Sequence, residues 1–121
     1  MDIRLSLVAL DCPDPLELAG FYRDLTGWPI DHISEDWVEL DAGAGVTIAC
    51  QKVEHFTPPE WPGSTHPQQL HLDFDVSDLD EGEARALEVG AKKTDFQPKP
   101  DSWRVFLDPV GHPFCLVLAD E

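Results

Sequence analysis

The same series of sequence signals occurs twice along this chain: an apolar strand, an acidic turn, a helix that ends at a glycine, and two further strands. In the first half the strands are expected at residues 5–10, 37–40 and 45–50, and in the second half at residues 70–76, 103–107 and 114–118. Each half is a strand–helix–strands unit that is too small to cover its own sheet. We therefore expect two such units to share a core, with a concave space between their sheets as the place for a ligand.

Size and charge limit the classes of partner. With 121 residues, 42% of them hydrophobic, the chain is long enough for one domain with a core of its own. The formal net charge of -16 would repel phosphates, so we expect no nucleic-acid partner and no membrane partner. No apolar run approaches the roughly 20 residues of a membrane span. The expected partner is a small-molecule ligand.

The cysteines predict the cellular compartment. Cys12, Cys50 and Cys115 are odd in number and lack CxxC spacing, and Asp2 and Arg4 interrupt any apolar leader at the start. These features predict a cytoplasmic protein with free thiols.

Both helices have clear start and stop signals. Asp14, Pro15 and Glu17 supply a cap, a first-turn proline and a capping-box acid, and Gly27 supplies a left-handed stop. The second helix repeats the capping box and stops near Gly90. Its start and its thin apolar stripe are formed by Asp78, Glu81, Leu79, Ala86 and Leu87. We expect the helices to cover one face of the sheets and to leave the other face free.

The strand over residues 70–76 alternates strictly. His71, Asp73 and Asp75 share one face, and apolar residues occupy the other. The polar face could line a cleft or lie in water, and periodicity alone does not choose between them. His71 with Asp73 could also act as a general base pair, or Asp73 could pair with Arg104 instead.

The halves are joined by a Pro-rich connection over residues 53–69, which the prolines exclude from a regular ladder. A connection of this length is usually functional or a linker. Trp61 within it could cap the cleft, but anchoring the loop to the core is the favoured interpretation.

Together these motifs resemble the vicinal oxygen chelate (VOC) superfamily, specifically a small glyoxalase-like domain of the bleomycin-resistance/dioxygenase type. The resemblance rests on residues 11–15, 21–22, 25–28, 59–62, 71–76, 89–91 and 105–118. It implies an α+β fold of two tandem βαβββ modules that form a half-open mixed β-barrel. The expected organisation is a single domain over residues 1–121, with module one at about 1–52, the connecting loop at about 53–69 and module two at about 70–121. Similar domains commonly pair, so a homodimer is expected.

The superfamily is diverse in chemistry, so the resemblance implies function only broadly. Its enzymes use a divalent metal that holds two neighbouring oxygens of the substrate. The superfamily's four ligand positions correspond here to Leu7 (or Ser6 after a one-residue slip), Gln51 (or Ala49), His71 and Cys115. His71 is a competent ligand, whereas Leu7 is not, and Cys115 stands where the metal-binding enzymes usually have Glu.

Two hypotheses follow. In the favoured one, the chain binds a small organic molecule without a complete metal site. In the alternative, it is a metal-dependent lyase, isomerase or dioxygenase that acts on a vicinal-oxygen substrate. A divalent metal (zinc, nickel, iron or manganese) would then be held by the incomplete set His71, Gln51 and Cys115. No catalytic residue is assigned, and the candidate pocket residues are His71, Asp73, Trp61, Trp103 and Arg104. Arg104 is included because an anionic ligand would need a basic residue in this acidic chain.

Overall fold

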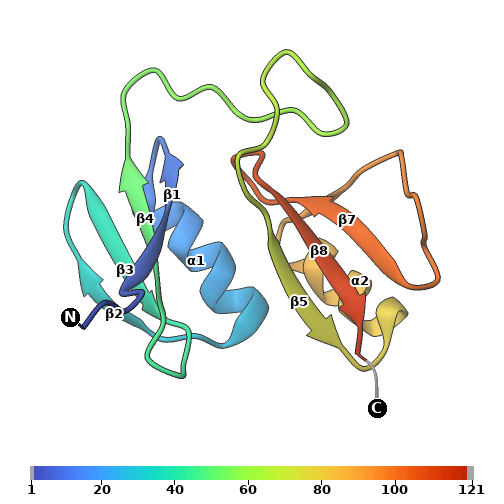
Figure 1. Ribbon diagram of the computed structural model, residues 1–121, viewed down its shortest axis with the longest axis horizontal. Coiled ribbons are helices and arrows are strands. Elements are labelled where there is room, and N and C mark those ends of the chain that lie inside the picture. The colour runs from blue at the N-terminus through green and yellow to red at the C-terminus, as the bar shows by residue number, and fades with distance from the viewer. Residues whose placement is uncertain (1, 120–121) are drawn as a thin grey trace. The chain divides into compact units, whose positions relative to one another are not determined.

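The computed structural model describes residues 2–119 and confirms the repeated architecture (Figure 1). The chain forms two compact units whose boundary lies between Phe56 and Thr57. Most of the Pro-rich connection therefore belongs to the second unit.

The first unit is a four-stranded mixed sheet with one helix. Its elements are β1 (Leu7–Cys12), α1 (Pro15–Thr26), β2 (Ile30–Ile33), β3 (Trp37–Asp41) and β4 (Thr47–Lys52). The strand order is β1-β4-β3-β2, in which β1 pairs with β4 in parallel and the other pairs are antiparallel. α1 packs on β3 and β4.

The second unit repeats this topology element by element. It consists of β5 (Leu72–Val76), α2 (Leu79–Glu88), β6 (Lys92–Lys93), β7 (Trp103–Leu107) and β8 (Pro113–Leu118). The order β5-β8-β7-β6 again has one parallel pair, β5 with β8. The α+β fold and its two βαβββ modules are thus as predicted, and each sheet is open at both edges.

The predicted helix caps are present. Asp14 accepts a hydrogen bond from the backbone N–H of Glu17 at 3.3 Å, and Gly27 ends α1 with a φ of 83°. Asp78 accepts from the backbone N–H of Glu81 at 3.0 Å. These side chains satisfy N–H groups that the first turn of a helix leaves without partners.

The helix α2 packs closely on the second sheet. A Cβ added at Gly82 would lie 3.1 Å from side-chain atoms of Val76 and Leu116, so the absence of a side chain sets this approach. Ala86 is fully buried on the same helix, whereas Leu87, predicted in the apolar stripe, is 44% exposed. The stripe is therefore narrower than the sequence indicated, because helix and sheet meet along a line of small residues.

The segment between β4 and β5 has one isolated β-bridge, between Glu60 and Pro67, and forms no extended β-ladder within the described residues. Trp61 stacks on Phe96 with ring centroids 5.7 Å apart, which attaches this segment to the loop after β6. Within residues 2–119, no helix has the length and apolar character needed to cross a bilayer.

Candidate functional site

Strand alternation divides the second sheet into two chemically different faces. In the register, Asp73 lies beside Cys115, and Cys115 lies beside Val105 on the next strand. These residues share the face away from α2, because the neighbouring positions Phe74 and Leu116 point toward the helix side. Along each of these strands, residues that face α2 alternate with residues that face away from it. A residue of the core and a residue of the candidate site can therefore be direct neighbours in the sequence.

A cavity of about 340 Å³ lies on the face away from α2. Its apolar lining comes from Trp103, Val105, Pro113 and Val117, and its polar lining from Gln68, His71, Asp73 and Cys115. Trp61, from the segment before β5, completes the wall. All of these residues belong to the second unit, so the cavity is formed within it.

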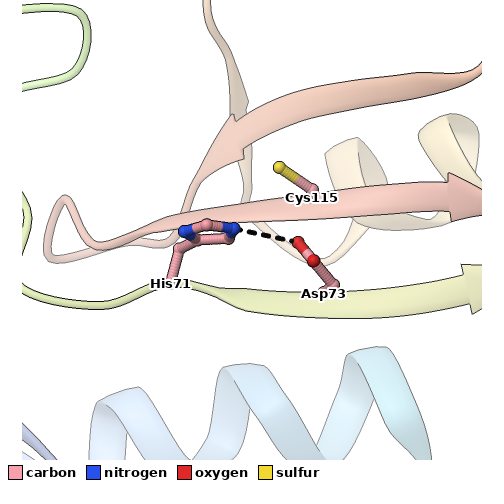
Figure 2. Close-up of side chains that lie close together, drawn as sticks. All are labelled: His71, Asp73 and Cys115. Atoms are coloured by element: carbon pink, nitrogen blue, oxygen red, sulfur yellow. Dashed lines mark ion pairs between the residues drawn. The ribbon is translucent and has the colours of Figure 1, made fainter.

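His71 and Asp73 are in contact at the start of β5, with 3.2 Å between Nε2 and Oδ1, and they form an ion pair when the imidazole is protonated (Figure 2). Their side chains are 42% and 56% exposed, so the pair faces open space in the cavity. Ion pairs of this exposure contribute little to stability.

The third side chain drawn in Figure 2, Cys115, is only 8% exposed. Burial, followed by the charge of Asp73 and a hydrogen bond with that carboxylate, raises the pKa of the Cys115 thiol to about 11. The thiol is protonated at neutral pH, which makes Cys115 a hydrogen-bond donor to Asp73 and a poor nucleophile.

One potential ligand atom each from His71, Asp73 and Cys115 lies within 4.8 Å of the other two. Nitrogen, oxygen and sulfur together suit zinc better than a hard ion such as manganese. Binding would have to displace the proton that the raised pKa of Cys115 holds on the sulfur. The types of ligand atom thus fit a soft divalent ion, whereas the protonated state of the Cys115 thiol does not.

Gln68 places an amide at the cavity, and its buried Oε1 has no hydrogen-bond partner among the described residues. A buried acceptor without a partner costs free energy that a bound donor could recover.

Of the pocket residues predicted from sequence, four line this cavity: Trp61, His71, Asp73 and Trp103. The structure instead places Arg104 on the opposite face, beside Leu116 in the register. Its Nη1 donates to Asp80 at 2.9 Å and to Glu83 at 3.3 Å, and its Nε donates to the carbonyl of Pro100 at 2.8 Å. The acids of α2 therefore occupy Arg104, and Asp73 pairs with His71 instead.

The predicted metal ligands are divided between the two units. His71 and Cys115 come together in the second unit, whereas Gln51 lies on β4 of the first, where its carbonyl accepts a weak hydrogen bond from the Cys12 thiol at 3.5 Å. Asp73 takes the third place beside His71 and Cys115.

Sequence reasoning did not identify Gln68 or the apolar lining as site residues. Strand alternation from Cys115 would have found Pro113 and Val117, because residues two apart share a face. Nothing in the local sequence distinguishes Gln68 from its neighbour Gln69.

A second cavity of about 330 Å³ shares Trp61 with the first. Its charged lining consists of Lys92, Lys93 and Asp95, and Phe96 forms part of its apolar lining. Lys93 pairs with Glu83 at 2.9 Å.

Comparison with known proteins gives a consistent result for the fold. The sequence model described as "Glyoxalase-like domain" matches residues 7–117. No functionally curated protein sequence matches the chain.

Three similar solved structures illustrate the range of related proteins. A glyoxalase/bleomycin resistance protein/dioxygenase family enzyme from Burkholderia phytofirmans is 19% identical, with a TM-score of 0.69 over 94% of this chain and 97% of that one. The fosfomycin resistance protein FosX from Mesorhizobium loti is 16% identical, with a TM-score of 0.71 over 99% and 94%. The oxidase ChaP-H2 is 20% identical, with a TM-score of 0.68 over 99% and 96%. At these identities the similarity establishes the fold alone.

Proposed function

Because the chain belongs to the Glyoxalase-like domain family, we propose that it binds a small organic molecule in the larger cavity of its second unit, without a complete metal site. The membership confirms the resemblance seen in the motifs. The observation that carries the proposal is the cavity of about 340 Å³, which combines an apolar lining with a few polar groups at one side. This combination is typical of small-molecule sites, where apolar contact supplies affinity and polar groups fix orientation.

The test is a thermal-shift screen with a library of small aromatic and alicyclic compounds. At least one compound should raise the melting temperature saturably, because a ligand that binds only the folded state stabilises it by mass action. Val117→Phe, which fills the cavity, should abolish the shift. Leu118→Phe makes a similar change on the next residue of β8, which is not part of the cavity lining, and should retain it. A screen without any saturable shift, or an equal shift in both variants, would contradict the proposal.

A second candidate function, a metal-dependent lyase, isomerase or dioxygenase, is favoured by the cluster of His71, Asp73 and Cys115. A divalent ion there would supply Lewis-acid stabilisation of charge that develops on a substrate oxygen. The names of the similar proteins, a fosfomycin resistance protein and an oxidase, fit this candidate as well.

Metal content separates the two candidates. The enzyme candidate expects near-stoichiometric zinc, nickel, iron or manganese in protein purified without chelators, and loss of that metal in His71→Ala. His66→Ala is the matched control, because His66 pairs with Glu60 and is outside the cluster. The binding proposal expects the ligand-induced thermal shift to persist after chelation.

Assembly and location belong to the same proposal. We expect a homodimer, and light scattering at micromolar concentration is the measurement; a monodisperse monomer would contradict it. A reducing cytoplasm is supported by the three cysteines, which are all buried and free of disulfides.

A further inference from the structure

The ionisable groups of the larger cavity are few. Among its lining residues only His71, Asp73 and Cys115 carry ionisable side chains, and burial raises the pKa of the Cys115 thiol to about 11. Asp73 is therefore the one carboxylate in the lining, and no lysine or arginine accompanies it.

The nearby cations are committed to other partners or to the other cavity. Arg104 is held on the opposite face by Asp80 and Glu83. Lys92 and Lys93 line the smaller cavity, and Lys93 is paired with Glu83. Among the lining residues of the larger cavity, His71 is therefore the only side chain that could carry a positive charge to bind an anionic group.

The remaining groups favour positive charge instead. The Asp73 side chain is 56% exposed, and a carboxylate that has accepted from His71 and Cys115 still offers lone pairs. Trp61 and Trp103 present indole rings to the same space, and Trp61 is held in place by Phe96. Aromatic faces attract ammonium groups. Gln68 also lines the cavity, and its buried Oε1 lacks a donor among the described residues.

We propose that the occupant of the larger cavity is a small organic cation: a protonated amine on an apolar body, with its ammonium directed to Asp73 and its body against Trp61 and Trp103. The inference rests on the proposed function and names the class of ligand. It extends that function because an apolar cavity alone does not distinguish cations, neutral molecules and anions.

The test uses three compounds with the same phenylethyl body: 2-phenylethylamine, 2-phenylethanol and 3-phenylpropionate. Their affinities for the full chain are measured by titration calorimetry with millimolar ligand and with EDTA present, which excludes a bound divalent ion as the cause. The amine should bind about tenfold more tightly than the carboxylate, given typical charge-assisted and cation–π contributions. Asp73→Asn should weaken the amine about tenfold and leave the alcohol unchanged.

Asp95→Asn is the matched control. It removes the same charge from the same unit, but Asp95 lines only the smaller cavity. Its effect on amine affinity should be about twofold or less, since Asp95 is exposed and is not part of the lining of the larger cavity, so water and salt screen its charge. Equal weakening in both variants would overturn the inference, because the preference would then come from the overall charge of the protein.

The remaining outcomes are also decisive. If the alcohol or the carboxylate binds as tightly as the amine, the inference fails while the proposed function stands. If none of the three binds, the inference fails, and the library screen with Val117→Phe decides the proposed function separately.

Discussion

At the scale of single residues, the surroundings of Cys115 alter the chemistry of its thiol. Its thiol is buried beside a carboxylate, and both conditions disfavour the thiolate. The raised pKa also links ionisation to stability. Because the folded value of about 11 exceeds the ordinary 9.0, the contribution to the free energy of unfolding is complete below pH 9.0 and is lost as pH rises through about 11.

The alkylation of Cys115 should therefore require high pH. At pH 9.0 a thiol with a pKa of about 11 is only about 1% ionised, whereas an ordinary cysteine is half ionised. The rate of reaction with iodoacetamide, followed by mass spectrometry of the Cys115 peptide, should be half-maximal near pH 11. Mass spectrometry distinguishes the peptide of Cys115 from those of Cys12 and Cys50, which are both fully buried, so their alkylation is followed separately.

Asp73→Asn should raise the rate at pH 9.0 about 3- to 10-fold, because removing the anion lowers the pKa of Cys115. Asp75→Asn is the control: it lies on the same strand and is not among the charges that shift this pKa. An unchanged rate in Asp73→Asn would show that burial alone protects the thiol.

At the scale of elements, the turn between β7 and β8 positions the segment that carries Trp61. The carboxylate of Asp108 accepts hydrogen bonds from the backbone N–H groups of Val110, Gly111 and His112, each at 3.0 Å. Gly111 has a φ of 103°, and a Cβ there would lie 2.9 Å from Cβ of Pro58. The turn and the Pro-rich segment therefore meet at a point with no space for a side chain.

Gly111→Ala should lower the free energy of unfolding by about 1–3 kcal/mol, because it combines an unfavourable φ with a steric overlap. Gly45→Ala separates the two effects, since Gly45 has a φ of 79° and nothing within 4 Å of an added Cβ. Urea unfolding should show roughly 1 kcal/mol for Gly45→Ala. Equal costs at both positions would mean that the contact with Pro58 relaxes freely.

Gln97 fastens the loop after β6 to the edge of β7. Its Nε2 donates to the carbonyl of Val105 at 2.8 Å, and its Oε1 accepts from the N–H of Val105 at 2.9 Å. Gln97→Ala should cost about 1–3 kcal/mol, because the N–H of Val105 loses its partner in a part-buried place, while the carbonyl of Val105 still accepts from Thr94. Gln69→Ala, at an exposed position, should be near neutral in the same urea titration. A neutral Gln97→Ala would mean that water replaces the amide without penalty.

At the scale of the whole molecule, the excess of 24 acidic over 8 basic residues sets the response to salt. Charge of one sign destabilises the folded state through self-repulsion, and added salt screens it. Raising sodium chloride from low to physiological concentration should therefore increase the melting temperature. The expected increase is roughly 3–6 °C for each 1 kcal/mol by which screening raises the free energy of unfolding. Calorimetry over a series of sodium chloride concentrations is the measurement. A fall with salt would show that ion pairs such as that of Arg104 outweigh the repulsion.

The sequence by itself determined the repeated units, the ends of both helices and the parity of β5, because capping groups, glycine stops and alternation act within a few residues. It did not mark β2 and β6. β2 is mostly exposed, and β6 is a pair of lysines, so neither edge strand has an alternating apolar pattern.

Only the tertiary structure decided which side chains meet. Strand alternation and strand pairing place three predicted residues in one cavity, namely His71, Asp73 and Trp103. Arg104, the residue after Trp103, lies on the opposite face and pairs with the acids of α2. Local signals fix the face of a strand only relative to its own neighbours. Register across strands and the packing of a helix then select the face that holds the site, and these depend on contacts between residues far apart in the chain.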